Sequence, residues 1–392
     1  MKLCIATQTV NKGNGQGRVN YEIVREAITR SHTVTLLASS IAPELQKHPL
    51  IEWVPILTDQ LPTAILRDLF FAWKSTRWLH QHHSSIDIIK VNGAITFATA
   101  DINAIHFVHS AWLKSGFHTI RYRKDFYGLY QWLYTNISAQ WEVKAFYQAR
   151  LLVAVSEQVK RELIELGLSA SSIQVILNGV DLAEFQPGAI DRESLGLPRD
   201  VPIALFAGDI RTPRKNLDMT LFALARVPGL HLAVAGDTVG SPYPQIAADL
   251  KVDKRTHFLG YRSDIAKIMQ GVDFFVFPSR YEACSLVLLE ALASGLPVIT
   301  AATTGGSELI TSECGIVLSN PENVDDLTNA VEHLANNSDI RSVMGKHARR
   351  LAEQYAWNKQ AKNYVDLFEK LSLSKHCSKK RHSTNAVLTI DK

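Results

Sequence analysis

The sequence has few cysteines and no long apolar run, and each absence excludes a class of protein. Four cysteines occur in 392 residues and none forms a C-x-x-C pair, so neither a disulfide framework nor a zinc site is expected. A reducing compartment, the cytoplasm, fits this cysteine usage best. No apolar run approaches the roughly eighteen residues of a membrane-spanning helix. The first residues, MKLCIATQTV, are typical of a short strand and not of a signal peptide.

Several catalytic motifs are also absent. The sequence contains no H-E-x-x-H, G-x-x-x-x-G-K-[ST], G-x-S-x-G or D-x-D. The absence of D-x-D argues against a carboxylate pair that holds a metal–diphosphate complex, so we expect no metal and no cofactor. The net charge of +4 is too small to indicate a nucleic-acid partner. With 46% hydrophobic and 20% charged residues, the composition is that of an ordinary globular protein of two or three domains.

Short apolar runs recur along the chain with helical stretches between them. The expected strands are 2–8, 32–39, 51–56, 87–92, 104–110, 151–156 and 173–179, followed by 202–208, 230–236, 256–260, 273–279, 296–300 and 314–318. Such alternation predicts an α/β protein with parallel sheets covered by helices on both faces. Two series of strands predict two doubly wound domains, and the turn-rich stretch 178–202 lies between them. Ligands of doubly wound domains bind beyond the carboxyl ends of the strands, so a cleft between the domains is expected.

This pattern divides the chain into an N-terminal domain, residues 1–182, and a C-terminal domain, residues 183–356. An amphipathic helix is expected over 357–373, crossing back onto the N-terminal domain. The polar and basic stretch 374–392 is expected to be a mobile tail.

The stretch PSRYEACSLVLLEALASGLPV contains two glutamates, Glu282 and Glu290, on either side of an apolar segment. A buried strand ends near Ser279, and a helix begins near Ser285 and ends at Gly295 before a proline. The unpaired N–H groups of that helix start form an anion site, so a diphosphate there could have one glutamate near each end. An ordinary strand–loop–helix unit with two solvated glutamates is the alternative.

Other loops at strand ends carry residues suited to a phosphate ligand. NKGNGQG places Gly13, Gly15 and Gly17 before a helix, where a plain turn is the alternative. The loop DIRTPRK gathers Arg211, Arg214 and Lys215, which suit a diphosphate or form a solvated basic turn. TTGGSELI is a Gly-Gly turn before a helix expected near Ser307. His106 and His109 lie at the end of an expected strand and are either structural or functional.

Taken in order, GNGQGRVN, HFVHS, LLVAVSEQVKREL, ILNGVDLAEFQP, FAGDIRTPRKNL, HFLGYRSDI, FPSRYEACSLVLLEALASGLPVI and TTGGSELI resemble the retaining GT-B glycosyltransferases of the family-four (group 1) type. The resemblance covers residues 1 to about 370, and its most specific element is E-x7-E. It implies two Rossmann-like domains that face each other across a cleft, with the acceptor on the N-terminal side and a nucleotide sugar on the C-terminal side. It also implies transfer of a hexose to a glycan or lipid-linked acceptor with retained configuration and without a metal.

The resemblance also implies roles for individual residues. Glu290 would bind the donor ribose, Glu282 would lie near the transferred sugar, and Lys215 would bind the diphosphate. His109 would lie at the reacting centre. The remaining donor-binding positions are Gly15 and Gly17 in the closing loop, Tyr261 and Arg262 beside the base, and Ser285, Leu286 and Val287 at the turn that meets sugar and phosphate. Asn178 and Gly179 match a structural domain-connecting turn.

The sequence departs from the family pattern at two places. The family arginine after the glycine that matches Gly208 is replaced by Asp209, so Arg211, or second Arg214, is expected to take its role. The usual Gly-Phe-Gly after the first glutamate is Ala283-Cys284-Ser285, which leaves the donor sugar open. A GT-B sugar-nucleotide epimerase and a catalytically silent sugar- or nucleotide-binding protein are the alternative functions.

The segment 121–148 is unusually aromatic and begins with Arg121, Arg123 and Lys124. Three interpretations stand. It is a long helix whose aromatic side chains fill the core of the N-terminal domain, a peripheral contact with the inner face of a membrane, or a surface for a soluble glycan acceptor.

Overall fold

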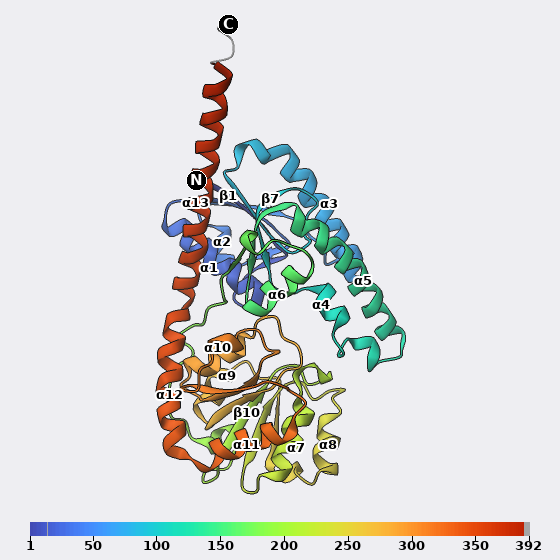
Figure 1. Ribbon diagram of the computed structural model, residues 1–392, viewed down its shortest axis with the longest axis vertical. Helices are drawn as coiled ribbons and strands as arrows, with labels where there is room; N and C mark the ends of the chain where they lie inside the picture. The colour runs from blue at the N-terminus through green and yellow to red at the C-terminus, as the bar shows by residue number, and fades with distance from the viewer. Residues whose placement is uncertain (14, 388–392) are drawn as a thin grey trace.

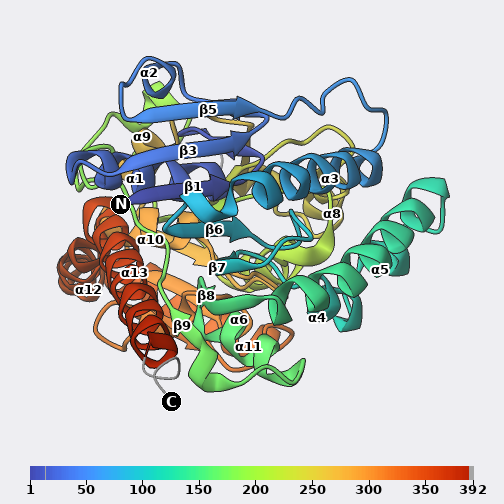
Figure 2. The same cartoon turned by 90° about the horizontal axis from the view of Figure 1, so that it is seen from above.

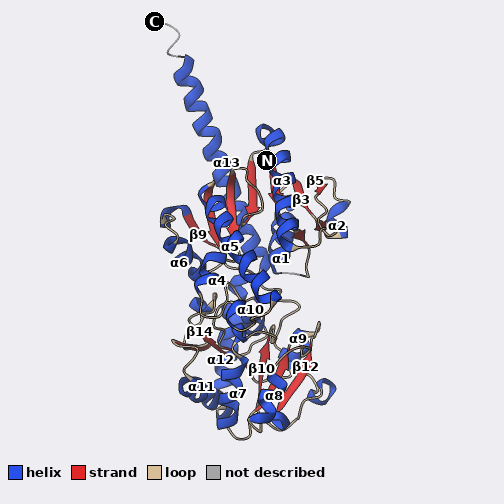
Figure 3. Ribbon diagram, turned by 90° about the vertical axis from the view of Figure 1, so that its right-hand side faces the viewer, coloured by secondary structure: helices blue, strands red, loops and turns tan. Residues whose placement is uncertain are grey.

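The structure, a computed structural model, describes residues 1–13 and 15–387 and consists of two parallel α/β units stacked along its long axis (Figure 1; Figure 3). The predicted fold class, two doubly wound parallel sheets, is confirmed. Within the described residues, no helix has both the length and the apolar character that a membrane crossing requires.

The first sheet has seven parallel strands in the order β5-β3-β1-β6-β7-β8-β9. Their bounds are β1 (Lys2–Ala6), β3 (Thr33–Ala38), β5 (Ile51–Pro55), β6 (Ile88–Asn92), β7 (Ala100–Ile105), β8 (Ala149–Ala154) and β9 (Ile173–Val175). Two short strands, β2 (Thr9–Val10) and β4 (Ser40–Ile41), pair beside it. The helices of this half are α1 (Gly15–Thr29), α2 (Pro43–Gln46), α3 (Ala64–His82), α4 (His109–Lys114), α5 (Phe126–Tyr147) and α6 (Glu157–Glu165).

The second sheet has six parallel strands in the order β12-β11-β10-β13-β14-β15. They are β10 (Ile203–Ala207), β11 (His231–Ala235), β12 (Thr256–Gly260), β13 (Phe274–Phe277), β14 (Val298–Ala301) and β15 (Gly315–Leu318). Its helices are α7 (Leu217–Arg226), α8 (Tyr243–Asp249), α9 (Ile265–Gln270), α10 (Leu286–Ala293), α11 (Val324–Asn336) and α12 (Ser338–Ala352). The strand order reverses between β10 and β13, and in the first sheet between β1 and β6. Ligand crevices form at such positions.

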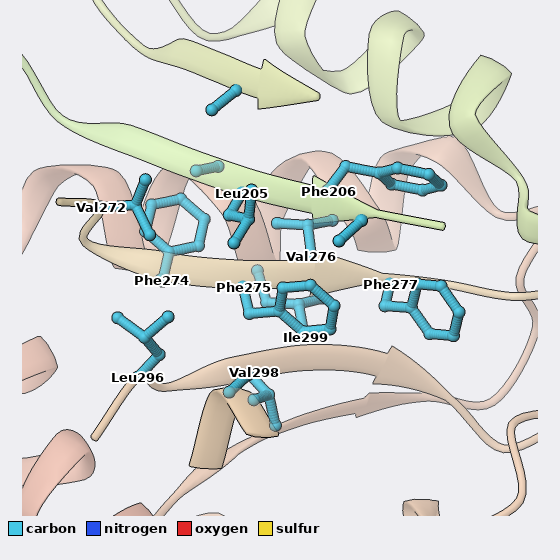
Figure 4. Close-up of a cluster of buried hydrophobic side chains, with 14 of the residues drawn as sticks. Leu205, Phe206, Val272, Phe274, Phe275, Val276, Phe277, Leu296, Val298 and Ile299 are labelled. Carbon is cyan, nitrogen blue, oxygen red and sulfur yellow. The ribbon is translucent and has the colours of Figure 1, made fainter. Parts of the chain in front are cut away.

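The central strands of the second sheet are apolar on both faces because helices cover both. Phe274, Phe275, Val276 and Phe277 are all fully buried in β13 (Figure 4). Leu205 and Phe206 of β10 and Ile299 of β14 pack beside them. This rigid core sets the positions of the loops that leave the ends of β10 and β13.

The last helix, α13 (Trp357–Val387), runs along one side of the molecule and packs beside α1 (Figure 1). Trp357, Tyr364, Val365 and Phe368 join the core of the first sheet, and Arg30 donates to Asp366 at 2.6 Å. The helix continues past residue 373, where the sequence analysis placed its end, to Val387, because no glycine or proline follows Trp357 in this stretch. Whether residues 374–387 are mobile stays a prediction. Residues 388–392 lie outside the described residues.

Two further expectations need correction. The strand expected over 104–110 is β7, which begins at Ala100 and ends at Ile105. It ends early because α4 begins at His109, and residues 106–108 form the turn between the strand and the helix. The helix expected near Ser307 is only a 3-10 turn, Ser307–Leu309. By contrast, α10 begins at Leu286 and is followed by Gly295 in the left-handed conformation (φ +76°), as the sequence predicts.

The aromatic side chains of α5 differ in how far they are buried. Among its aromatic side chains Phe146 is buried, whereas Phe126 is 92% exposed and Tyr127, Trp132 and Tyr147 are exposed as well. Together with α4, it extends outward from the side of the first domain (Figure 2). The interpretation that these aromatic residues fill the core is therefore wrong for most of them.

Candidate functional site

The loop after β10 carries the basic residues and is held in a defined shape. It ends in a 3-10 turn, Pro213–Lys215, followed by Asn216 in the left-handed conformation (φ +66°). The amide of Asn216 donates to the carbonyls of Pro278 (3.0 Å) and Pro321 (2.7 Å). Arg280 donates to the carbonyl of Pro213 at 2.8 Å and forms ion pairs with Asp218 and Glu322. The loop therefore cannot turn Lys215 outward without breaking buried hydrogen bonds.

The buried Lys215 and the partly buried Arg214 form a cluster of cations around one carboxylate. The ammonium group of Lys215 pairs with Glu282, and the Arg214 guanidinium lies 4.0 Å from the same carboxylate oxygen. Burial lowers the pKa of both, and Arg214 lowers the pKa of Lys215 further. Two cations that share one carboxylate favour an additional anion, and a diphosphate has the required charge.

Arg211 lies outside this cluster. Its guanidinium is more than half exposed and pairs with Asp209 at 2.9 Å, a contact between residues two positions apart. The structure therefore places Arg214, the second choice of the sequence analysis, beside Glu282. The physical reason is local, because Asp209 binds Arg211 while the 3-10 turn directs Arg214 inward.

The start of α10 lies opposite the glycine-rich loop of the first domain. Ser285 precedes the helix without capping it through its side chain, so the N–H groups of Leu286 and Val287 have no intrahelical partner. A methyl group at Gly15 would lie 3.3 Å from the Leu286 side chain, so the two helix starts nearly touch. Gly17 is buried in the first turn of α1. The positive ends of α1 and α10 thus meet beside the cation cluster.

Glu290 lies on α10 and is partly buried. Among the described residues no side chain forms a hydrogen bond or ion pair with its carboxylate. Burial raises its pKa to about 7, with a further increase from Glu184 and an opposing effect of Arg18. A carboxylate with no protein partner in a crevice is suited to accept hydrogen bonds from the hydroxyl groups of a ligand.

Tyr261 and Arg262 follow β12, the edge strand of the second sheet. Tyr261 is 84% exposed, and Arg262 donates twice to Asp264, at 2.7 Å each. Tyr261 therefore presents an exposed aromatic ring beside the end of β12, where a base could stack on it. The charge of Arg262 is neutralised by Asp264.

His109 begins α4 and is held by Glu142, a residue that the sequence analysis missed. The Glu142 carboxylate accepts from the backbone N–H of His109 (2.8 Å) and of Ser110 (2.7 Å), and it lies 3.1 Å from His109 Nδ1. This buried carboxylate on α5 caps α4. Because it binds Nδ1 of His109, Nε2 is the ring nitrogen left to contact a ligand. The separation of 33 residues left no signal in the sequence.

Direct contacts close the space between the domains. The hydroxyl of Tyr281 donates to the carbonyl of Val108 at 3.3 Å, which places Glu282 next to the His109 region. Ser156 Oγ donates to the carbonyl of Ala283 at 2.6 Å. Gly305 packs so closely on Ala283 that a Cβ atom would lie 1.8 Å from its carbonyl oxygen. The TTGG turn therefore packs directly against the loop that carries Glu282 and limits its movement.

A second crevice lies entirely within the first domain, at the carboxyl ends of β1, β6 and β7. It is a cavity of about 280 Å³ that reaches from Gln16 at the start of α1 to His109. Aromatic side chains (Phe107, Tyr134 and Trp141) and polar ones (Asp68, Asn92, His106 and Glu142) form its walls. In the described part of the chain, no group of three or more His, Cys, Asp or Glu side chains is arranged to hold a metal ion.

Comparison with known proteins agrees with this architecture. Residues 13–184 match the model of Glycosyltransferase Family 4, and residues 201–337 match that of Glycosyl transferases group 1. D-inositol 3-phosphate glycosyltransferases of Saccharomonospora viridis and Mycobacterium bovis are 30% and 31% identical over 240 and 220 residues, or 56% and 53% of this chain. The alignments cover 56% and 46% of those proteins, so the match spans about half the length of these relatives.

Solved structures resemble nearly the whole chain. Sucrose-phosphate synthase from Thermosynechococcus elongatus has a TM-score of 0.76 at 18% identity, covering 95% of this chain and 99% of that one. WaaG, a glycosyltransferase involved in lipopolysaccharide biosynthesis, has 0.71 at 20% identity, covering 93% and 99%. Anabaena HepE, solved in complex with UDP and glucose, has 0.67 at 19%, covering 94% and 100%. The chain therefore has the predicted GT-B fold, and the two family models match it in order, Glycosyltransferase Family 4 in the first domain and Glycosyl transferases group 1 in the second.

Proposed function

We propose that this protein is a glycosyltransferase that moves a hexose from a nucleotide-diphosphate sugar to a glycan or lipid-linked acceptor, with retained configuration and without a metal ion. The observation that carries the proposal is the buried cluster of Lys215, Arg214 and Glu282 at the start of α10. This cluster has the charge and the position to bind a diphosphate between the two domains.

The proposed roles follow from the surroundings of each group. Lys215, Arg214 and the α10 start stabilise the negative charge that develops on the leaving diphosphate. Glu290 accepts hydrogen bonds from the ribose hydroxyls, and Glu282 meets the transferred sugar. His109, oriented by Glu142, lies on the acceptor side of the reacting centre. A phosphate oxygen of the donor accepts the proton of the attacking hydroxyl.

The relatives support the class of donor. HepE, which shares the fold, was solved in complexes with UDP and with UDP-glucose. The cavity of the first domain opens next to His109 and is the proposed acceptor site. We further propose that the protein works in the cytoplasm and that the exposed face of α5 touches the inner face of the membrane.

A panel of UDP-, GDP- and ADP-hexoses tests this function. Slow hydrolysis of one member without an acceptor identifies the donor. Because a free hexose mutarotates, the anomeric configuration is read by NMR from the glycoside that forms when an alcohol or sugar acceptor is added. We expect retention and equal rates with and without EDTA. Activity that EDTA abolishes and Mn²⁺ or Mg²⁺ restores would contradict the metal-free proposal, and conversion of the nucleotide sugar into its epimer would show the epimerase. Binding without any turnover would show the silent binding protein.

A further inference from the structure

A buried lysine lies behind the lining of the first-domain cavity and has no acidic partner among the described residues. Lys90 lies on β6, is fully buried, and donates to the amide oxygens of Asn20 and of Asn92, the latter at 2.7 Å. Burial lowers its pKa to about 7. Asn20 in turn donates to Thr7 (3.0 Å) and to the carbonyl of Gln16 (3.0 Å). A buried polar network thus links β1, α1 and β6 beneath the cavity.

This network determines which end of Asn92 faces the cavity. Lys90 Nζ donates to the side-chain oxygens of both Asn20 and Asn92, so the Asn92 atom that lies 2.7 Å from Lys90 is its oxygen. The NH2 group is consequently directed away from Lys90, and Asn92 lines the cavity. Asn92 is 6% exposed and its Nδ2 atom has no hydrogen-bond partner. Lys90 therefore acts as a positioning residue for an unused hydrogen-bond donor.

A second unpartnered atom lines the same cavity from the neighbouring strand end. His106 follows β7, and its Nε2 atom is buried without a partner. Burial, followed by the nearby Lys90, lowers its pKa to about 3, so the ring is neutral. Buried polar atoms without partners are rare in folded proteins because each costs free energy. Two at the floor of one cavity indicate that a ligand supplies the missing partners.

The rest of the wall indicates the chemistry of that ligand. Asp68 and Glu142 place two carboxylates on the cavity wall, which disfavours an anionic ligand. Both carboxylates are already bound, Asp68 by Gln8 (2.6 Å) and Tyr134 (3.0 Å), and Glu142 by the α4 start. Aromatic rings with polar groups between them are the lining expected for a hydroxylated ring. A hydroxyl group both accepts and donates, so it can satisfy the Asn92 amide and a neutral imidazole.

We propose that this cavity holds an uncharged, hydroxyl-bearing ring of the acceptor, and that Asn92 and His106 select it by hydrogen bonds to its hydroxyl groups. The proposal rests on the proposed function and adds the acceptor's chemical class and two specificity-determining residues. The sugar or cyclitol ring enters at the carboxyl ends of β6 and β7, below His109.

The test uses the full-length protein saturated with UDP and NMR titration with glucose, galactose, mannose and myo-inositol, each compared with a monophosphate ester. His106→Phe removes both ring nitrogens, the unpartnered Nε2 among them, and keeps an aromatic ring at this position, and His333→Phe on the exposed face of α11 is the matched control. We expect at least one uncharged ring to bind. His106→Phe should weaken it at least tenfold, leave UDP affinity within twofold, and keep or raise the melting temperature. His333→Phe should change neither affinity.

A second variant removes the Asn92 donor without leaving an unpaired ammonium group. Lys90→Met with Asn92→Leu replaces both by apolar side chains of similar size, and it should also weaken ring binding at least tenfold. Unchanged ring affinity in His106→Phe, binding of phosphate esters alone, or binding of no ring by a protein that binds UDP would overturn the inference. A wild-type protein that binds no nucleotide would instead refute the proposed function.

Discussion

Lys215 is the residue whose surroundings are most specific for a diphosphate. It is buried, paired with Glu282 and unable to turn outward, because Asn216 and Arg280 hold its loop. Its partner Arg214 is partly buried, whereas Arg211, at a similar position in the sequence, is solvent-exposed and bound by Asp209. Substitution of each of these three basic residues should therefore lower activity to a different extent.

Lys215→Ala should lower kcat for the best donor of the hexose panel by roughly ten- to hundredfold. A charge-assisted contact contributes about 1.5–3 kcal/mol, and a group that acts on the leaving diphosphate loses this in the transition state. Arg214→Ala should cost at least tenfold in kcat/KM, and the exposed Arg211→Ala should stay within threefold. Steady-state kinetics and melting temperatures check the series. A larger loss for Arg211→Ala than for Arg214→Ala would show that the assignment is reversed.

The raised pKa of Glu290 should make donor binding depend on pH. Its pKa is raised to about 7, and ribose hydroxyls donate to the ionised form, so donor binding favours the deprotonated carboxylate. The Kd of the nucleotide sugar should therefore fall as pH rises from about 6 to about 8. Glu290→Gln should bind more weakly at high pH and show no such slope, whereas the exposed Glu332→Gln should behave like wild type. Calorimetric titration at several pH values decides, and a slope that persists in Glu290→Gln would contradict the role.

The same carboxyl has the opposite effect on stability. In the unfolded chain it loses its proton near 4.5, but in the folded protein it holds the proton up to about 7. The folded state therefore binds more protons between these values. Its contribution to the free energy of unfolding falls as pH rises through this range.

At the scale of elements, α5 combines an exposed apolar face with a basic start. Phe126, Tyr127, Leu129, Trp132 and Leu133 are all exposed, and Arg121, Arg123 and Lys124 precede them. Asp125 caps the helix by accepting from the N–H of Gly128 at 2.8 Å, so the face is rigid. A rigid aromatic face next to basic residues suits a bilayer with anionic headgroups.

The protein should therefore float with liposomes that contain anionic lipid at low salt, and less so at high salt. Changing Arg121, Arg123 and Lys124 to Glu should abolish flotation, as should Phe126→Ser with Leu129→Ser. The matched control changes two exposed basic residues of α12, Lys346 and Arg350, to Glu. A wild-type protein that stays in the soluble fraction would exclude the membrane contact, and a glycan surface would then be the better interpretation of α5.

At the scale of the whole molecule, two rigid sheets meet through a small number of contacts at the cleft. Tyr281 and Ser156 bond across it, and α13 connects the second domain to the core of the first. Gly15 already lies against Leu286, and a diphosphate bound at the two helix starts would hold the domains in this closed arrangement. Donor binding should therefore shift the protein toward its closed form.

Small-angle scattering measures this change. The radius of gyration should decrease when the saturating donor is added to wild type and should remain constant in Lys215→Ala, which binds the diphosphate poorly. Addition of free hexose is the control and should have no effect. Scattering curves that coincide with and without nucleotide would mean that the domains do not close.

The sequence by itself determined the local structure and the order of the elements. Alternating strands and helices, and the Leu- and Ala-rich α10 that stops before Gly295, depend on periodicity and backbone preferences over a few residues. The two doubly wound domains, and the placement of Glu282 before one helix and Glu290 within it, therefore followed from the sequence pattern, whereas the GT-B fold was implied by the family resemblance. The strand expected over 104–110 failed because its apolar residues continue past Ile105 into the approach to α4.

Only the tertiary structure decided which side chains meet. Arg214 and not Arg211 accompanies Lys215, Glu142 holds His109 from 33 residues away, and Lys90 binds the amide oxygen of Asn92. The aromatic residues of α5 proved mostly exposed. Such outcomes depend on long-range packing, because a charge or a ring has no preferred partner until the sheets bring distant residues together.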